Sequence, residues 1–135
     1  MLLFAADYDD RTSEVQNKLN ATGQFSAVDT IQAYVSRNTP NVAQLEQYDA
    51  VLGWSNGRGF NDPVTLGNNL ATYINHGGGV VVACFAISNN NFISGGFANS
   101  TYQAIITGDY AYYTYTAGVR HTLGSVHLPS SSIND

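Results

Sequence analysis

The chain has 135 residues, of which 44% are hydrophobic and 11% charged, with ten acidic against five basic side chains and a formal net charge of -5. This composition predicts one folded domain over residues 1–135 and excludes general disorder. The sequence has no run of lysines and arginines, so we expect neither a nucleic-acid nor a membrane partner. Neither a bilayer-spanning run nor a signal peptide is visible, so we expect a soluble, cytoplasmic protein.

The first elements alternate between apolar and amphipathic patterns, which is typical of an α/β protein with a parallel sheet. Leu2–Ala6 is a continuous apolar run and predicts a strand buried on both faces. Residues 12–23 follow as a helix that Thr12 or Ser13 caps and that Gly23 ends. The sequence therefore opens with a strand followed by a helix.

The next segments repeat this alternation. "FSAVDTI" (25–31) predicts a short strand, and "NTPNVAQLEQY" (38–48) predicts a short helix with Pro40 in its first turn. "YDAVLGWS" (48–55) predicts a second buried strand. The order favours parallel strands joined by helical crossovers.

The middle of the chain contains its longest predicted helix. Asp62 caps a helix over residues 63–77, after a glycine-rich loop, and "VVVACF" (80–85) has the strongest strand pattern. Residues 88–97 predict a long loop over the carboxyl ends of the strands. Beyond residue 101 the tyrosine-rich sequence predicts β-structure that includes a hairpin at Gly108-Asp109.

These elements predict a three-layer, flavodoxin-like α/β sandwich with a mostly parallel sheet. Ligands of such sheets bind at the carboxyl ends of the strands. The segments expected there are residues 7–11, 55–60 and 84–91, and we searched them for chemistry.

Two stretches, "YDAVLGWS" and "FNDPVTLGNNLATYINHGGGVVVACFA", resemble the class I glutamine amidotransferase-like superfamily, particularly its ThuA-like branch. The resemblance implies a nucleophile elbow, Gly-x-Cys-x-Gly, at residues 82–86, with Cys84 in the position of the nucleophile. "RHTLGSV" (120–126) resembles a His-Pro-rich segment of ThuA-like domains. Both elbow glycines are replaced, by Val82 and Ala86, and the His-x-Glu partner pair is missing, which suggests a divergent or truncated member without the full catalytic set.

Cys84 has two interpretations. A catalytic thiol needs a base or a cation that lowers its pKa from about 8.5, and His121 and His127 are the candidate bases. The alternative is that Cys84 packs as a small apolar side chain in the core. We favour the core interpretation and keep the pair Cys84 and His121 as the catalytic alternative.

The acidic stretch after the first strand also has two interpretations. Asp7 and Asp9 could bind Mg²⁺ or contribute to a ligand site, since hard cations take carboxylate oxygens. The alternative is a solvated acidic loop before a helix, where negative charge is favourable. We favour the second interpretation and expect neither a metal nor another cofactor.

The stretch "WSNGRGFND" (54–62) is the best candidate for a binding loop. Trp54 can offer an apolar face, Asn56 hydrogen bonds, and Arg58 a planar fork for a carboxylate or a hydroxyl-bearing ligand. The alternative is that the two glycines simply make a turn and Trp54 belongs to the core.

The tyrosine-rich segment "YAYYTYT" (110–116) either packs as an ordinary hairpin or exposes an edge that pairs with another chain. We therefore expect a homo-oligomer, with a homodimer that covers this edge. The leading hypothesis is a non-catalytic domain that binds a small polar, sugar-like ligand at the strand ends. The alternatives are a cysteine-dependent hydrolase or amidotransferase relative and a self-associating structural module.

Overall fold

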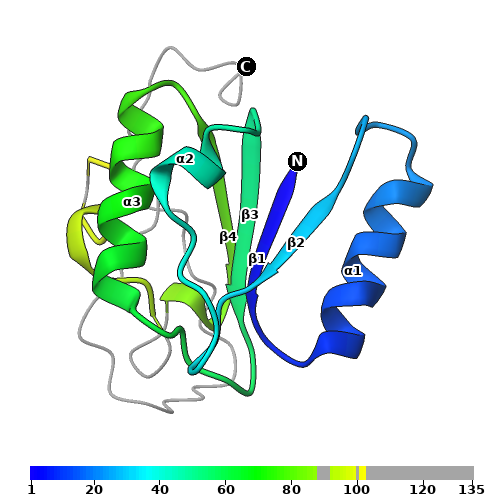
Figure 1. Ribbon diagram of the computed structural model, residues 1–135, viewed down its shortest axis with the longest axis horizontal. Coiled ribbons are helices and arrows are strands. Elements are labelled where there is room, and N and C mark those ends of the chain that lie inside the picture. Colours follow the sequence, from blue (N-terminus) through cyan, green and yellow to red (C-terminus); the bar gives the residue numbers. More distant parts are fainter. Residues whose placement is uncertain (88–91, 100, 103–135) are drawn as a thin grey trace, which may run out of the picture.

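The computed structural model in Figure 1 describes residues 1–87, 92–99, 101 and 102, and only the backbone of Cys84. The elements of these ranges are β1 (Leu2–Ala6), α1 (Asp9–Ala21), β2 (Asp29–Gln32), α2 (Val42–Leu45), β3 (Ala50–Ser55), α3 (Pro63–Asn75), β4 (Gly79–Cys84) and the short 3-10 helices η1 (Phe85–Ile87) and η2 (Gly95–Phe97).

The four strands form one all-parallel sheet in the order β2-β1-β3-β4. Helix α1 covers one face of the sheet, and α2 and α3 cover the other (Figure 1). This is the three-layer, flavodoxin-like α/β sandwich that the sequence predicts. All four strands therefore end at one edge of the sheet, which we call the carboxyl edge.

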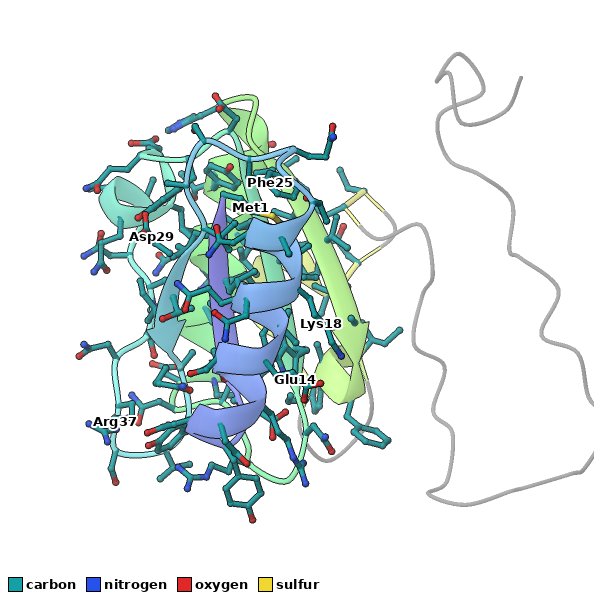
Figure 2. The ribbon with its side chains drawn as sticks, turned by 90° about the vertical axis from the view of Figure 1, so that its right-hand side faces the viewer. Met1, Glu14, Lys18, Phe25, Asp29 and Arg37 are labelled. Atoms are coloured by element: carbon teal, nitrogen blue, oxygen red, sulfur yellow. The ribbon has the colours of Figure 1, made fainter. Side chains whose placement is uncertain are left out.

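The α1 face is held by a small apolar cluster. Leu3 and Ala5 of β1 and Trp54 of β3 are buried there, with Val15 and Leu19 of α1 packed against them. Helix α1 packs against β1 and β2, and Figure 2 shows it in front of them, with β4 beside it and not under it.

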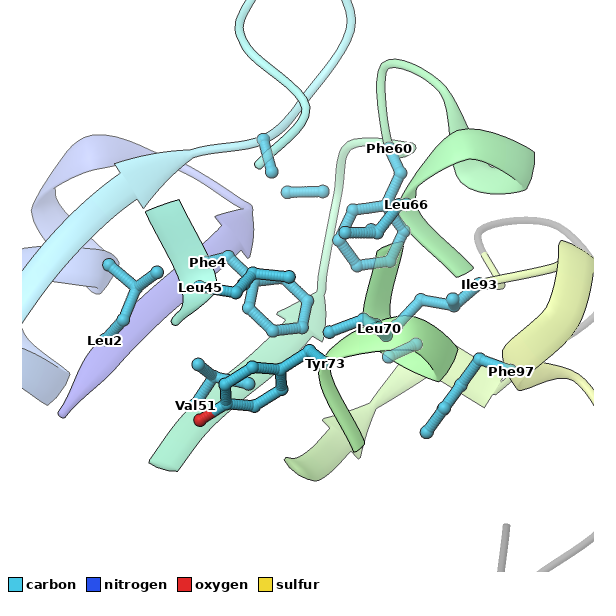
Figure 3. Close-up of a cluster of buried hydrophobic side chains, with 13 residues drawn as sticks. Leu2, Phe4, Leu45, Val51, Phe60, Leu66, Leu70, Tyr73, Ile93 and Phe97 are labelled. Carbon is cyan, nitrogen blue, oxygen red and sulfur yellow. The ribbon is translucent and has the colours of Figure 1, made fainter. Parts of the chain in front are cut away.

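The larger core lies between the sheet and the helices α2 and α3 (Figure 3). Its buried members are Leu2, Phe4, Ala6, Ala33, Leu45, Val51, Phe60, Leu66, Leu70, Tyr73, Ala86, Ile93 and Phe97. Phe4 packs directly over the backbone of β3, because a Cβ atom at Gly53 would lie 2.0 Å from its ring. Glycine at this position of β3 is thus required by packing, whatever its backbone conformation.

The N-terminus of α1 corrects the sequence prediction. The helix begins at Asp9 after an N-cap at Tyr8, so neither Thr12 nor Ser13 caps it. Their hydroxyls instead donate to the backbone carbonyls of Tyr8 at 3.2 Å and Asp9 at 2.9 Å, inside the helix. The acidic residues of the first turn favour this earlier start, since they interact well with the positive end of the helix dipole.

Two further boundaries differ from those expected. Strand β2 covers Asp29–Gln32, so most of the predicted strand 25–31 precedes it. Pro40 lies before α2, whose N-cap is Asn41, and Asn41 and Gln44 form a reciprocal capping box. The predicted cap of α3 is confirmed, because Asp62 accepts the backbone N–H of Thr65 at 2.9 Å.

The described part of the predicted loop 88–97 lies along α3 and not over the carboxyl edge. Ile93 and Phe97 are buried in the α2–α3 core, and the backbone N–H of Ser94 donates to the carbonyl of Pro63 at 3.1 Å. Gly67 makes this close approach possible, since a Cβ atom there would lie 1.6 Å from the carbonyl oxygen of Ser94. Residues 88–91 and the predicted hairpin at Gly108-Asp109 lie outside the described residues.

None of the helices found in the described part of the chain combines the length and the apolar character needed to cross a bilayer.

Candidate functional site

The most unusual feature of the carboxyl edge is Arg58, whose guanidinium group lies against two tyrosine rings. Its central carbon is 4.0 Å from the ring centroid of Tyr34 and 4.8 Å from that of Tyr8. Arg58 is half-buried in this position. Because a guanidinium group stacks favourably on aromatic faces, the two rings fix its orientation.

Two further arginines extend this arrangement. The guanidinium carbon of Arg37 lies 5.5 Å from the centroid of Tyr34, and its Nε donates to the Tyr34 hydroxyl at 3.0 Å. Arg11 lies 5.1 Å from the centroid of Tyr8. We call Tyr8, Arg11, Tyr34, Arg37 and Arg58 the arginine–tyrosine cluster. It gathers three of the chain's five basic side chains at one end of the molecule, where Figure 2 shows Arg37 near the start of α1.

The members of the cluster come from the carboxyl ends of three different strands. Tyr8 follows β1, Tyr34 and Arg37 follow β2, and Arg58 lies in the loop after β3. Arg11 stands in the first turn of α1. The convergence follows from the topology, since parallel strands end at the same edge of the sheet.

Backbone hydrogen bonds tie the loop after β3 to the segment after β2. The N–H of Val35 donates to the carbonyl of Gly59 at 3.2 Å, and the N–H of Asn61 donates to the carbonyl of Ala33 at 2.9 Å. The N–H of Ser36 also donates to the side-chain oxygen of Asn61 at 3.2 Å. These bonds place Arg58 over Tyr34 by means of the backbone, so its position does not depend on stacking alone.

A strained turn brings Arg37 back over Tyr34. Ser36 has a φ of 72°, which is uncommon for a residue other than glycine, and the N–H of Arg37 donates to the carbonyl of Tyr34 at 2.9 Å. Such a left-handed conformation costs about 1–2 kcal/mol for an ordinary residue. Strain of this kind concentrates at functional sites.

Asp7 lies beneath the cluster, and its carboxylate is fully engaged. One oxygen accepts the backbone N–H of Tyr8 at 2.8 Å and lies 3.3 Å from Arg11 Nη1, and the other accepts the indole N–H of Trp54 at 3.1 Å. The aspartate is 2% exposed and the tryptophan 5%. Trp54 is therefore a core side chain that anchors Asp7 and presents no apolar face at the carboxyl edge.

The acidic residues do not assemble a metal centre in the described part of the chain, where no group of three or more potential metal ligands occurs. Asp9 is exposed in the first turn of α1, and Asp7 directs its oxygens to the three protein donors named above. The two carboxylates thus contribute to the site by charge and by positioning neighbouring groups.

The electrostatics of the cluster are dominated by its cations. A hydrogen bond from Arg37, with a further one from Arg58, lowers the pKa of the Tyr34 hydroxyl below its ordinary value, although burial and Asp9 oppose this effect. In return, the hydrogen bond to Tyr34 raises the pKa of Arg37. Among the described residues, neither Arg37 nor Arg58 forms a salt bridge. Both arginines therefore keep donors that no carboxylate of the described chain neutralises.

Asn56 and Cys84 lie at the same edge. The backbone N–H of Asn56 donates to the carbonyl of Ala6 at 3.0 Å, which continues the ladder between β1 and β3, and the residue is half-buried. Cys84 is the last residue of β4, in register with the buried Ser55 of β3, and η1 begins directly after it. His121 and His127, the candidate bases for Cys84, lie outside the described residues, as do "RHTLGSV" (120–126) and the tyrosine-rich segment.

Arg58 is predictable from the sequence as a binding residue, whereas the residues that hold it are not among the predicted site residues. Tyr8 and Arg11 belong to a stretch that was examined only for its aspartates. Tyr34 and Arg37 follow β2, whose carboxyl end is not among the three segments named as candidate strand ends. The signal was available in "YVSR" (34–37), where an aromatic and a basic residue follow a short strand.

Comparison with known proteins gives no similarity to report: no family model, no curated protein and no solved structure matches this chain.

Proposed function

We propose that this protein binds a small polar ligand through a carboxylate or phosphate group, at the arginine–tyrosine cluster of the carboxyl edge. The observation that carries the proposal is the guanidinium group of Arg58, which is stacked against Tyr8 and Tyr34 and has no carboxylate partner among the described residues.

The stacking determines which part of Arg58 can bind a ligand. Both rings lie against the guanidinium group, and a hydrogen bond to the Tyr34 hydroxyl occupies one of its donors, so the other N–H donors are the ones that a ligand can reach. A planar fork of N–H donors matches the two oxygens of a carboxylate or phosphate. Since the Arg58 side chain is already oriented, it loses less conformational entropy when a ligand binds.

The surrounding charges support an anionic ligand group. Asp7 is paired with Arg11. Asp9 is the acidic residue whose charge affects the pKa values of Tyr34 and Arg37. Neither Arg37 nor Arg58 forms a salt bridge with a carboxylate of the described residues, although the whole chain carries a net charge of -5. Both tyrosine rings also have cations against them, which leaves less aromatic surface for stacking a sugar ring. An anionic group, with or without an attached sugar, thus fits the cluster better than a neutral sugar does.

Calorimetric titration with a panel of small hydroxy acids, sugar phosphates and neutral sugars tests this proposal. We expect saturable binding of at least one anionic compound and none of the neutral sugars. Arg58→Gln removes the charge-assisted hydrogen bonds and is expected to weaken binding by about 1.5–3 kcal/mol, roughly ten- to hundredfold.

Lys18→Gln is the matched control. This substitution also removes one positive charge from the chain. Lys18 is exposed on α1, where it pairs with Glu14 at 2.7 Å. Figure 2 shows this pair away from the end of α1 that lies at the carboxyl edge. Equal binding by the wild type and Arg58→Gln, or equal losses in the two variants, would exclude Arg58 as the specific anchor.

A cysteine-dependent hydrolase or amidotransferase relative remains a second proposal, together with membership of the class I glutamine amidotransferase-like superfamily. Support comes from Cys84, the last residue of β4, which precedes the turn into η1 as the resemblance implies. Ala86, in the position of an elbow glycine, is a small residue and is 0% exposed. Rapid iodoacetamide labelling of the native thiol, with a midpoint well below pH about 8.5, is the expected result for a nucleophile. Labelling only after denaturation would exclude this role.

A further inference from the structure

The two residues that follow β3, Asn56 and Gly57, form the chain's only Asn-Gly pair. In such a pair the backbone nitrogen of the glycine can attack the side-chain carbonyl carbon of the asparagine, because glycine has no Cβ atom that hinders the approach. Asparagine therefore loses its side-chain amide most readily when glycine follows it. In a folded protein the reaction also requires that hydrogen bonds do not hold the two groups apart.

Neither reacting group is held in this way in the described part of the chain. The side-chain amide of Asn56 and the backbone N–H of Gly57 form no hydrogen bond with another described residue. Asn56 is half-buried and Gly57 is exposed, so water reaches the pair. The hydrogen bond from the Asn56 N–H to the carbonyl of Ala6, at 3.0 Å, involves neither reacting atom and does not have to break.

The other asparagines of the described ranges are less reactive, either through their hydrogen bonds or through their position. Asn17 and Asn20 lie within α1, whose backbone N–H groups are bonded along the helix. Asn38 is exposed but precedes the β-branched Thr39, which hinders the attack. Hydrogen bonds hold the side chains of Asn41, Asn61, Asn68, Asn69, Asn75 and Asn99.

We propose that Asn56-Gly57 is a deamidation site, through which the carboxyl edge becomes more acidic with time. The Gly57 nitrogen bonds to the side-chain carbonyl carbon of Asn56 and closes a five-membered succinimide ring. That carbon releases its amide nitrogen as ammonia, which takes up the proton of the Gly57 N–H. Water, the only co-reactant, then adds to one of the two ring carbonyls and breaks its bond to nitrogen. The product is aspartate or isoaspartate, so a carboxylate replaces a neutral amide.

The new charge arises beside the arginine–tyrosine cluster. Gly57 lies against Tyr8, since a Cβ atom there would be 3.0 Å from the ring, and Arg58 is the next residue. A carboxylate at position 56 supplies an acidic group near Arg58 and repels an anionic ligand. Isoaspartate also lengthens the backbone by one atom, which shifts the loop that positions Arg58. The expected loss of affinity rests on the proposed function, whereas the deamidation itself does not.

Peptide mass spectrometry of the full-length protein, after incubation in warm, mildly alkaline buffer, tests the site. We expect the mass increase of deamidation to arise first at residue 56, at a rate within about tenfold of that in the urea-unfolded chain. In Asn56→Gln this position is expected to stay unmodified, because glutamine must close a larger ring more slowly. Asn38→Gln is the matched control and is expected to deamidate at residue 56 as the wild type does.

A native rate more than about tenfold below the unfolded rate, or earlier deamidation at another asparagine, would overturn the proposal. The effect on the ligand is measured with Asn56→Asp, which is expected to bind an anion about two- to fivefold more weakly than Asn56→Gln. Equal affinities of these two variants would contradict the expected loss. If the wild type binds no anion while residue 56 still deamidates, the proposed function fails and the modification site stands.

Discussion

Replacing Gly67 with alanine tests how the chain after β4 is held against α3. In most helices this change is stabilising, by about 1 kcal/mol, because alanine has the higher helix propensity. Here the added Cβ would lie 1.6 Å from the carbonyl oxygen of Ser94 and 3.3 Å from the side chain of Ile93. A backbone carbonyl cannot rotate away as a flexible side chain can, so the segment that contains it must move.

Two responses are possible, and their free-energy costs can be compared. Full release of this segment exposes Ile93 and Phe97, which are 1% and 3% exposed, at about 1.5–3 kcal/mol each. Displacement within a packed core costs about 1–3 kcal/mol, with so close a contact at the upper end of that range. Displacement is the cheaper response. After subtraction of the propensity gain, we expect Gly67→Ala to lower the free energy of unfolding by about 2 kcal/mol.

Urea denaturation followed by far-UV circular dichroism measures this difference. The control is Asn17→Ala on the exposed surface of α1, where a smaller gain in helix propensity, a few tenths of a kcal/mol, is expected without a clash. Equal or greater stability of Gly67→Ala relative to the wild type would refute the packing of residues 93–97 on α3.

Three other predictions follow from the site and its surroundings. Trp54→Phe removes the indole N–H that donates to the buried carboxylate of Asp7. Urea denaturation is expected to show a free energy of unfolding lower by about 1–3 kcal/mol, and a loss well below this range would show that the hydrogen bond contributes little. Tyrosinate absorbance should show Tyr34 ionising below its ordinary pKa, and Arg37→Gln should raise that pKa; an unchanged titration would contradict the Arg37 contact. Because the folded pKa is lowered, this interaction stabilises the protein only at alkaline pH and is lost as the pH falls through the folded value. Hydrogen bonds from the Thr65 hydroxyl and backbone lower the pKa of Asp62, so its stabilising effect is present above the ordinary value and lost as acid protonates it. Asp62→Asn keeps the acceptor without the charge, and its thermal midpoint should therefore depend less on acidic pH than that of the wild type.

The parts of the fold that could be predicted are those with a strong local pattern. β1, β3 and β4 are continuous apolar runs, and α3 begins at an aspartate followed by proline, so their positions follow from burial and capping alone. The three-layer architecture follows from the alternation of these elements. Each of these predictions depends on contacts between residues close in sequence.

One of the predictions that failed depends on a tertiary contact, and the other on a competition between two local effects. The first strand pairs with residues 29–32, with Leu2 opposite Asp29, and no local pattern indicates this register. The helix α1 starts at Asp9 because its acidic first turn suits the helix dipole, although two hydroxyl residues further along have the better capping propensity.

The candidate site could be predicted only in part for the same reason. Arg58 was identified because a basic residue in a glycine-rich loop after a strand is visible in sequence. Its stacking against Tyr8 and Tyr34 arises from three separate strand ends, which only the topology brings together. The core position of Trp54 likewise depends on α1, which packs over it.

The central claim is that Arg58 binds the anionic group of a ligand, and the most direct test of it is the Nε–H resonance of Arg58 in a nitrogen-15 NMR spectrum. The resonance is assigned by its loss in Arg58→Lys. It is then followed while a hydroxy acid or sugar phosphate that binds the protein is added. We expect a saturable shift of Arg58 and a smaller one of Arg37, both larger than the effect of sodium chloride at equal ionic strength. No shift at Arg58 while the ligand binds elsewhere, or shifts that sodium chloride reproduces, would contradict a ligand site at the carboxyl edge.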